Sequence, residues 1–261
     1  MKPQTLILLF VLPLSAAIVS GADVFDLFRK KTAGDSSPAG AAAAALGLSE
    51  DQMIGGLKEA LGNGVQKAVA NLGKPDGFLK DLAVMIPMPD SLRKVDKTLR
   101  AVGQGRLADE FLMTMNRAAE QATPEAAAIL GNAVKQMSIA DAKSILTGTN
   151  NAATQYFRRS SETNLYAHFL PIVKAATEKA GVTGAYKRMA DVGAGGGGFG
   201  ALGTFGGNLL SKEMPDIDGY VTHKALDGLF SKIADQEKLI RENPVARSTD
   251  LLKKVFGAIQ K

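Results

Sequence analysis

Apolar residues recur at steps of three and four along most of this chain, which is the spacing of one face of an α-helix. The first such run covers residues 50–72, where Ser49 and Gln52 have the spacing of a capping box. Gly73 and Pro75 then end the run, because glycine is common just past a helix and proline cannot continue one. The same pattern predicts helices at 90–102, 107–123, 124–137, 139–146, 152–180, around 186–189, at 215–240 and at 249–259. Asp90 and Ser138 are predicted to cap the helices over 90–102 and 139–146.

The pattern contains no alternating apolar and polar run of β-branched residues, so we expect at most a minor sheet. We therefore predict an all-α fold: a single multi-helix domain over residues 49–259, arranged as an irregular or orthogonal bundle. Pro87 and Pro89 make residues 84–89 extended, and their polar backbone groups must find partners elsewhere. A short helical turn is expected at 78–82, and Pro171 should kink or break the helix over 152–180.

The first 48 residues do not follow the helical pattern. Lys2, an apolar run over 6–19 and the small residues Ser20 to Ala22 have the layout of a cleaved signal peptide, which leaves Asp23 as the first mature residue. Residues 23–48 are rich in Gly, Ala and Ser and are interpreted as a flexible tether. The chain has no cysteine, so it lacks the lipobox cysteine that would anchor it to a membrane. We expect a periplasmic or secreted protein.

The distribution of charge along the chain bears on which partners the protein can bind. The 31 basic residues exceed the 26 acidic ones by five, and both signs are interspersed along the helices. This distribution is typical of a solvated surface, so we expect no nucleic-acid partner. Weak contact with an anionic membrane surface stays open, as does the oligomeric state.

Several stretches together resemble the uncharacterised bacterial family called domain of unknown function 4197. They are GLKEAL (56–61), NLGKPDGF (71–78), IPMP (86–89), MNRAAE (115–120), DAKSILTG (141–148), AATQYFR (152–158), KALDGLF (224–230) and LLKKVFG (251–257). The resemblance covers roughly residues 50–257 and implies an exported, mainly helical protein. It supplies no catalytic residues.

A glycine-rich segment, residues 193–207, departs from that family pattern and holds nine glycines in fifteen positions. It matches G-x-G-x-x-G, but a nucleotide site also needs a buried strand before the loop and a helix after it. Here a short predicted helix precedes the segment in place of a strand, and no acidic residue follows it at the expected spacing. We therefore interpret this segment as a flexible loop.

The candidate ligand-binding residues are Tyr156, Arg158, Arg159 and His168, all on the helix predicted over 152–180. Guanidinium groups and a phenol on neighbouring turns can donate to a carboxylate or a phosphate. In the alternative interpretation, Arg158 pairs with Glu162 four residues on, and Tyr156 and Phe157 anchor the helix in the core.

Other chemistry has little support in the sequence. His168 and His223 are the only imidazoles, and neither has a nearby partner at metal-site spacing, so we expect no metal and no cofactor. Each histidine is more typical of a partly buried hydrogen-bonding residue. Met85, Met88, Met113, Met115 and Met137 are expected either to line an adaptable groove or to fill the core.

The favoured hypothesis is an exported, non-catalytic protein of the cell envelope that binds an apolar or anionic ligand or a protein partner. The alternative is a periplasmic enzyme without cofactor, in which the Tyr, Arg and His side chains named above act with a distant carboxylate. Convergence of such groups in one cleft would favour the enzyme.

Overall fold

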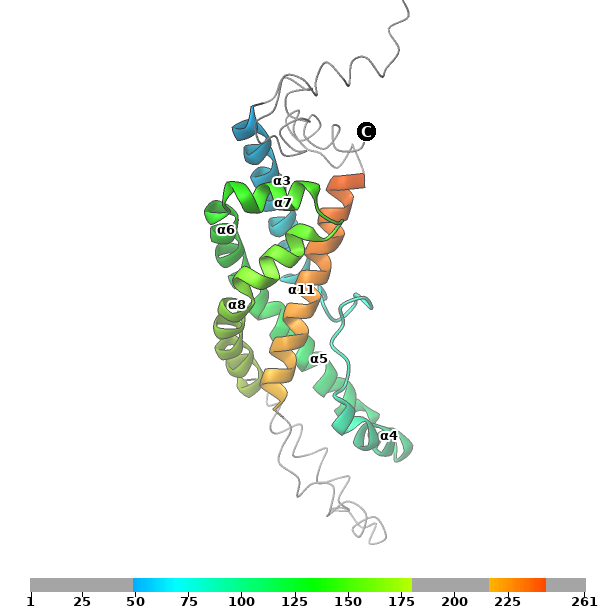
Figure 1. The fold of residues 1–261 in the computed structure, drawn as a ribbon. Coiled ribbons are helices and arrows are strands. Elements are labelled where there is room, and N and C mark those ends of the chain that lie inside the picture. The colour runs from blue at the N-terminus through cyan, green and yellow to red at the C-terminus, as the bar shows by residue number, and fades with distance from the viewer. Residues whose placement is uncertain (1–48, 180–215, 243–261) are drawn as a thin grey trace, which may run out of the picture. The chain divides into compact units, whose positions relative to one another are not determined.

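The computed structural model describes residues 49–179 and 216–242, which belong to one compact unit. They form α-helices, two 3-10 turns and connecting loops, with no strand among them, and this confirms the all-α prediction (Figure 1). The α-helices are α3 (Glu50–Leu72), α4 (Arg93–Ala101), α5 (Gly105–Ala122), α6 (Ala126–Gln136), α7 (Ile139–Thr147), α8 (Ala152–Lys179) and α11 (Ile217–Glu242). None of these helices is both long and apolar enough to cross a membrane.

Two helices begin at the capping residues that the sequence indicated. The Ser49 hydroxyl accepts from the Gln52 amide at 3.2 Å, and the Gln52 side chain accepts from the Ser49 amide at 2.9 Å. At α7, Ser138 and Asp141 make the same reciprocal pair, with both distances 3.1 Å. Each pair satisfies two amides that have no partner inside the helix.

Two other boundaries differ from the prediction in detail. Asp90 does not cap a helix with its side chain: it opens a 3-10 turn, Asp90–Leu92, and pairs with Arg93 at 2.8 Å. Pro124 lies in a second 3-10 turn, Thr123–Glu125, so α6 begins two residues after the proline. In both places a tighter turn redirects the chain before the α-helix starts.

The core is built around α8 and α11: α8 packs against α5, α6, α7 and α11, and α11 also packs against α3 and α5. Helix α8 passes through Pro171 without ending, so the expected kink or break does not divide it. The largest fully buried side chains come from every part of the described chain: Phe78, Phe111, Phe157, Phe169, Phe230, Leu57, Leu72, Ile86, Leu99, Met115, Leu130 and Leu146.

Residues 85–89 are extended, as the two prolines predict, and their backbone finds partners in side chains. The Asn116 amide of α5 accepts from the Ile86 N–H at 2.8 Å and donates to its carbonyl at 3.0 Å. The Tyr220 hydroxyl of α11 donates to the Pro87 carbonyl at 3.0 Å. Residues 78–82 lie in hydrogen-bonded turns that do not extend into a regular helix, and the two amides at their start bind a carboxylate described below.

Five predicted features lie outside the described residues: the signal peptide, the tether, the helix near 186–189, the glycine-rich loop and the helix over 249–259.

Candidate functional site

The structure places the four sequence-predicted binding residues on α8 but directs them to different neighbours. Tyr156 is half-buried and donates its hydroxyl to the Ala133 carbonyl of α6 at 3.0 Å, and burial raises the pKa of its phenol. Arg158 turns toward α11. It pairs with Glu162 at 2.9 Å and with Asp227 at 3.3 Å, and its guanidinium lies 4.6 Å from the centre of the Phe230 ring.

The other two side chains are exposed. At the start of α7, hydrogen bonds from Ser138 lower the pKa of Asp141. The positive charge of the exposed Arg159 lowers it further. His168 lies two turns further along α8. The other described histidine, His223, is also exposed and stacks on Tyr166 at 4.7 Å between ring centroids. The Arg158–Glu162 pair and the buried Phe157 confirm the structural interpretation of this stretch, and its binding role stays a prediction.

The methionines are mostly part of the core. Met88, Met115 and Met137 are buried and Met85 is half-buried, whereas Met113 of α5 is 43 % exposed. The sequence left two roles open for these methionines, and the buried ones fill the core.

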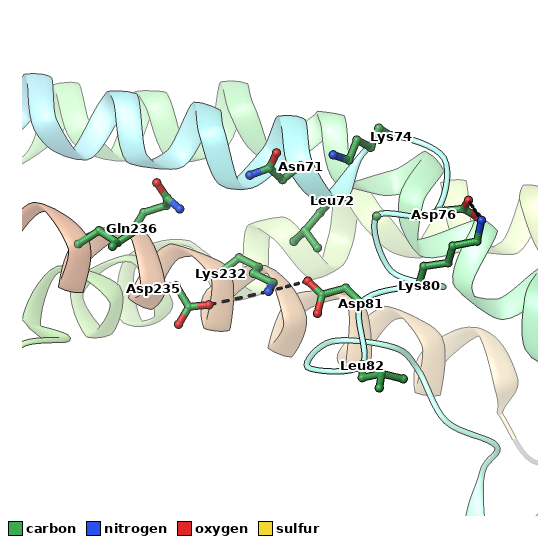
Figure 2. Close-up of a pocket in the computed structure, with 12 residues that line it drawn as sticks. Asn71, Leu72, Lys74, Asp76, Lys80, Asp81, Leu82, Lys232, Asp235 and Gln236 are labelled. Atoms are coloured by element: carbon green, nitrogen blue, oxygen red, sulfur yellow. Dashed lines mark ion pairs between the residues drawn. The ribbon is translucent and has the colours of Figure 1, made fainter. Parts of the chain in front are cut away.

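A groove of about 620 Å³ lies between the turn that follows α3 and the middle of α11 (Figure 2). We call it the turn–α11 groove. One wall comes from the end of α3 and the turn, and the other from α11; the lining residues are Asn71, Leu72, Lys74, Asp76, Gly77, Lys80, Asp81, Leu82, Lys232, Asp235, Gln236 and Leu239. Most of these side chains are exposed or half-buried, so the groove is open to solvent.

The turn is held by a carboxylate from α5. Glu120, whose side chain is 4 % exposed, accepts from the Phe78 amide at 3.1 Å and from the Leu79 amide at 3.2 Å. Its second oxygen pairs with Arg117 at 2.7 Å, and Arg117 also donates to Asp76. Because a charged acceptor makes strong hydrogen bonds to amides, this network holds the turn that forms one wall of the groove.

Ion pairs fill both walls. Asp76 accepts from Lys80 at 2.7 Å and from Arg117, and hydrogen bonds from these two cations lower the pKa of its carboxyl. Asp81 pairs with Lys232 of α11 at 2.6 Å, which lowers the pKa of Asp81 and links the turn to the helix. Figure 2 shows this pair extending across the groove, with Asp235 on the far side of Lys232 at 3.9 Å.

Two leucines on the rim are exposed. Leu82 leaves 86 % of its surface in solvent, more than any other large hydrophobic residue in the described part of the chain. Leu239, on α11, is 47 % exposed. Lys74 is exposed as well, and no ion pair within the described residues involves it.

Residues 47–257 match the family model described as "Protein of unknown function (DUF4197)". The chain belongs to this family. No curated protein and no solved structure matches it. Every residue of the turn–α11 groove lies inside the part of the chain that matches DUF4197.

In this DUF4197 protein the carboxylates of Asp76 and Asp81 in the groove are held in ion pairs. Among the described residues, no group of three or more His, Cys, Asp and Glu is placed to hold a metal ion. Asp76 and Asp81 have lowered pKa values, so they carry their charge at neutral pH. General acid–base catalysis is most effective when the group titrates near the working pH, so the lowered values favour binding over proton transfer.

Sequence reasoning did not find this groove because its two walls lie about 150 residues apart in the chain. The one available signal was Lys-Pro-Asp-Gly at 74–77, which reads as a turn. No sequence signal indicated that Leu82 would be exposed, because a leucine at the start of an apolar run is expected in the core.

Proposed function

We propose that this protein is an exported, non-catalytic protein of the cell envelope that binds a partner protein in the turn–α11 groove. The observation that carries the proposal is Leu82, which is 86 % exposed on the rim of a groove with charged walls. An exposed leucine beside the groove can serve as an apolar anchor for a partner, and the charged walls can make polar contacts with it.

The openness of the groove favours a partner protein over an enclosed small molecule. Small-molecule sites bury most of their ligand and are lined mainly by apolar side chains. Here Leu72 is the only buried side chain with a large apolar surface in the lining, and charged groups occupy both walls. A protein segment can cover Leu82 and Leu239 while its polar groups remain near solvent at the rim.

Binding at this groove can be tested by site-specific cross-linking in cells. A photo-reactive amino acid replaces Leu82 in the full chain, and Ile139 serves as the control because it is 53 % exposed on α7, which does not line the groove. We expect a discrete cross-linked product from position 82 and none from position 139. The product should weaken when Leu239 is also changed to serine. Equal products from both positions, or none from position 82, would contradict the proposal.

Export is tested separately. The layout of residues 1–22 predicts that a signal peptidase removes them, so intact mass spectrometry of the protein from the cell envelope should show Asp23 at the N-terminus. A variant with Leu8→Arg in the apolar run should stay in the cytoplasm with its leader attached. A wild-type protein that keeps residues 1–22 and stays in the cytoplasm would contradict export, but it would leave the proposal of binding at the groove unchanged.

A further inference from the structure

One stripe of α3 changes from buried to exposed along the length of the helix. Four residues share this stripe, because positions four, seven and eleven apart recur on one side of a helix: Gly56, Ala60, Asn63 and Lys67. Gly56 and Ala60 are buried, whereas Asn63 is half-buried and Lys67 is exposed. Met53, one turn before Gly56, is 3 % exposed. This side of α3 is therefore covered over its first turns and open to solvent further along.

The described helices α6 and α7 pack on other sides of α3. Lys58 donates to the Lys135 carbonyl at the end of α6, and it lies about 160° around the helix from Gly56. Glu50 pairs with Lys143 of α7 at 2.9 Å and lies about 120° from Gly56. Neither α6 nor α7 thus faces the buried part of the stripe.

Helix α11 lies nearest to the stripe but ends too early to cover it. A Cβ atom at Gly64 would lie 3.4 Å from the Gln236 Cβ and 3.6 Å from the Ile240 Cδ1, so the last turn of α11 lies beside Gly64. Figure 1 shows α3 and α11 running in opposite directions, with the first turns of α3 extending past the end of α11. After Ile240, α11 rises only about 3 Å more, whereas Met53 lies about 16 Å beyond Gly64 along α3.

The chain therefore leaves α11 beside the buried part of the stripe. Residues 243–248 separate the end of α11 from the helix predicted over 249–259. Six extended residues span up to about 20 Å, which is enough to reach the first turns of α3. The predicted helix has one apolar side, formed by Leu251, Leu252, Val255, Phe256 and Ile259. The match to the DUF4197 model extends to residue 257 and so includes most of these positions.

We infer that residues 249–259 dock on the first turns of α3, with their apolar side over Gly56 and Ala60. These two residues are small, so the two helices can approach closely. Charge fits the same arrangement: residues 243–261 contain four basic residues and one acidic residue, and the exposed Glu59 lies next to the stripe. The docking face is at the opposite end of α3 from the turn–α11 groove, so docking there does not depend on the groove.

Because the chain has no cysteine, a single introduced cysteine reports whether its position is covered. Ala60→Cys, Lys67→Cys and Ala118→Cys are each labelled with a maleimide in the purified full chain. Lys67 is the exposed control on the same stripe, and Ala118, 1 % exposed within α5, is the buried control. We expect position 60 to react at least about tenfold more slowly than position 67, because only an exposed thiolate reacts rapidly.

The covering segment is identified by changing its two sides separately. Leu252→Asn with Phe256→Asn removes apolar contacts and should raise the labelling rate at position 60 about tenfold. Lys253→Asn with Lys254→Asn, on the opposite side, is the matched control and should change this rate by less than about threefold, since surface charges contribute little. Position 118 should stay protected in both variants, which shows that the bundle remains folded.

A disulfide measurement tests the same contact with smaller changes to the segment. Ala60→Cys is combined in turn with Leu252→Cys, Val255→Cys and Ile259→Cys on the apolar side, and with Lys253→Cys on the polar side. A disulfide requires Cα atoms within about 7 Å of each other. We therefore expect mild oxidation to link position 60 to an apolar position of the segment and not to position 253.

Two results would overturn the inference. One is equal labelling at positions 60 and 67. The other is protection of position 60 that survives Leu252→Asn with Phe256→Asn, together with no disulfide to the apolar side, because another segment would then provide the cover.

A basic amphipathic helix can also lie on an anionic membrane, so labelling is repeated with vesicles of phosphatidylglycerol and phosphatidylethanolamine. We expect position 60 to stay protected when the vesicles are present. A rate that rises to that of position 67 only with vesicles would show that the membrane removes the segment from α3, and it would overturn α3 as the binding site of the segment.

Discussion

At Gly77 the backbone runs so close to the end of α3 that a Cβ atom there would lie 2.4 Å from the Leu72 carbonyl oxygen. The neighbouring Asp76 adopts a φ of 68°, which is uncommon for a residue with a side chain. These two residues fold the turn tightly enough to bring the Phe78 amide to Glu120. The position of the groove wall thus depends on one residue without a side chain and on one strained residue beside it.

Replacement of Gly77 by alanine should destabilise the protein by about 1–3 kcal/mol, because backbone atoms must move to admit the methyl group. Gly131→Ala is the matched control. A Cβ at Gly131 meets nothing within 4 Å in the middle of α6, so alanine there should stabilise by about 0.5–1 kcal/mol. Urea denaturation followed by circular dichroism measures both effects. A Gly77 variant as stable as the wild type would show that the turn adapts easily.

Single-residue interactions could be predicted from the sequence where a residue binds its near neighbours in the chain. Ser49, Ser138 and the Arg158–Glu162 pair all bind within four residues, so their spacing was enough to predict them. The partner of Phe78, in contrast, is Glu120, 42 residues away. No local pattern identifies a carboxylate that reaches its partner only through the packing of α5 on the turn.

Among the helices, α8 begins in an unusual way, because its first amides bind a side chain from another helix. Glu237 of α11, 3 % exposed, accepts from the Ala153 and Thr154 amides at 2.9 Å each. Arg241 pairs with the same carboxylate at 2.9 Å and donates to the Ile145 carbonyl at the end of α7. A buried carboxylate at a helix N-terminus satisfies the free amides and interacts favourably with the helix dipole.

We expect Glu237→Ala to destabilise the protein by about 3–5 kcal/mol, because it leaves the helix amides without their acceptor and removes the carboxylate that is paired with the buried Arg241 guanidinium. Asp235→Ala, two residues earlier on the same helix and 60 % exposed, should change stability by less than about 0.5 kcal/mol. Thermal unfolding followed at 222 nm compares the two. Similar melting temperatures for both variants would refute the capping role.

The ion pair between Asp81 and Lys232 should make the attachment of the turn to α11 sensitive to pH. The folded pKa of Asp81 lies below its ordinary value of about 3.9, so the pair stabilises the fold above that pH and is lost as pH falls through the folded pKa. Asp81→Asn should therefore cost about 0.5–1 kcal/mol at pH 7, and this difference should shrink below about pH 4. Urea titrations at pH 7 and pH 3 measure it. A difference that persists unchanged at pH 3 would contradict the mechanism.

Across the whole described part of the molecule, α11 joins helices that are distant in sequence. It packs against α3, α5 and α8, and its Leu229 is fully buried. The 3.6-residue periodicity was sufficient to predict the all-α fold and most of the helix boundaries. It could not predict which helix would be central, because an amphipathic pattern shows that a face is buried without showing what covers it.

Leu229→Ala should therefore cost about 2–5 kcal/mol, the usual range for a cavity in a well-packed core. Because α11 packs against three other helices, the loss of stability should lower the urea midpoint of one cooperative unfolding transition. Far-ultraviolet circular dichroism and tyrosine fluorescence, followed together in urea, should give the same midpoint. Midpoints that separate in this variant would show that the helices around α11 unfold as independent units.

The late position of α11 in the chain has a consequence for biosynthesis. A polypeptide leaves the ribosome from its N-terminus, so α3, α5, α7 and α8 are all made before residue 217 emerges. Until then α8 lacks the carboxylate that caps it, and the apolar surfaces that α11 covers stay open. The nascent chain therefore cannot complete its native core before α11 has been synthesised.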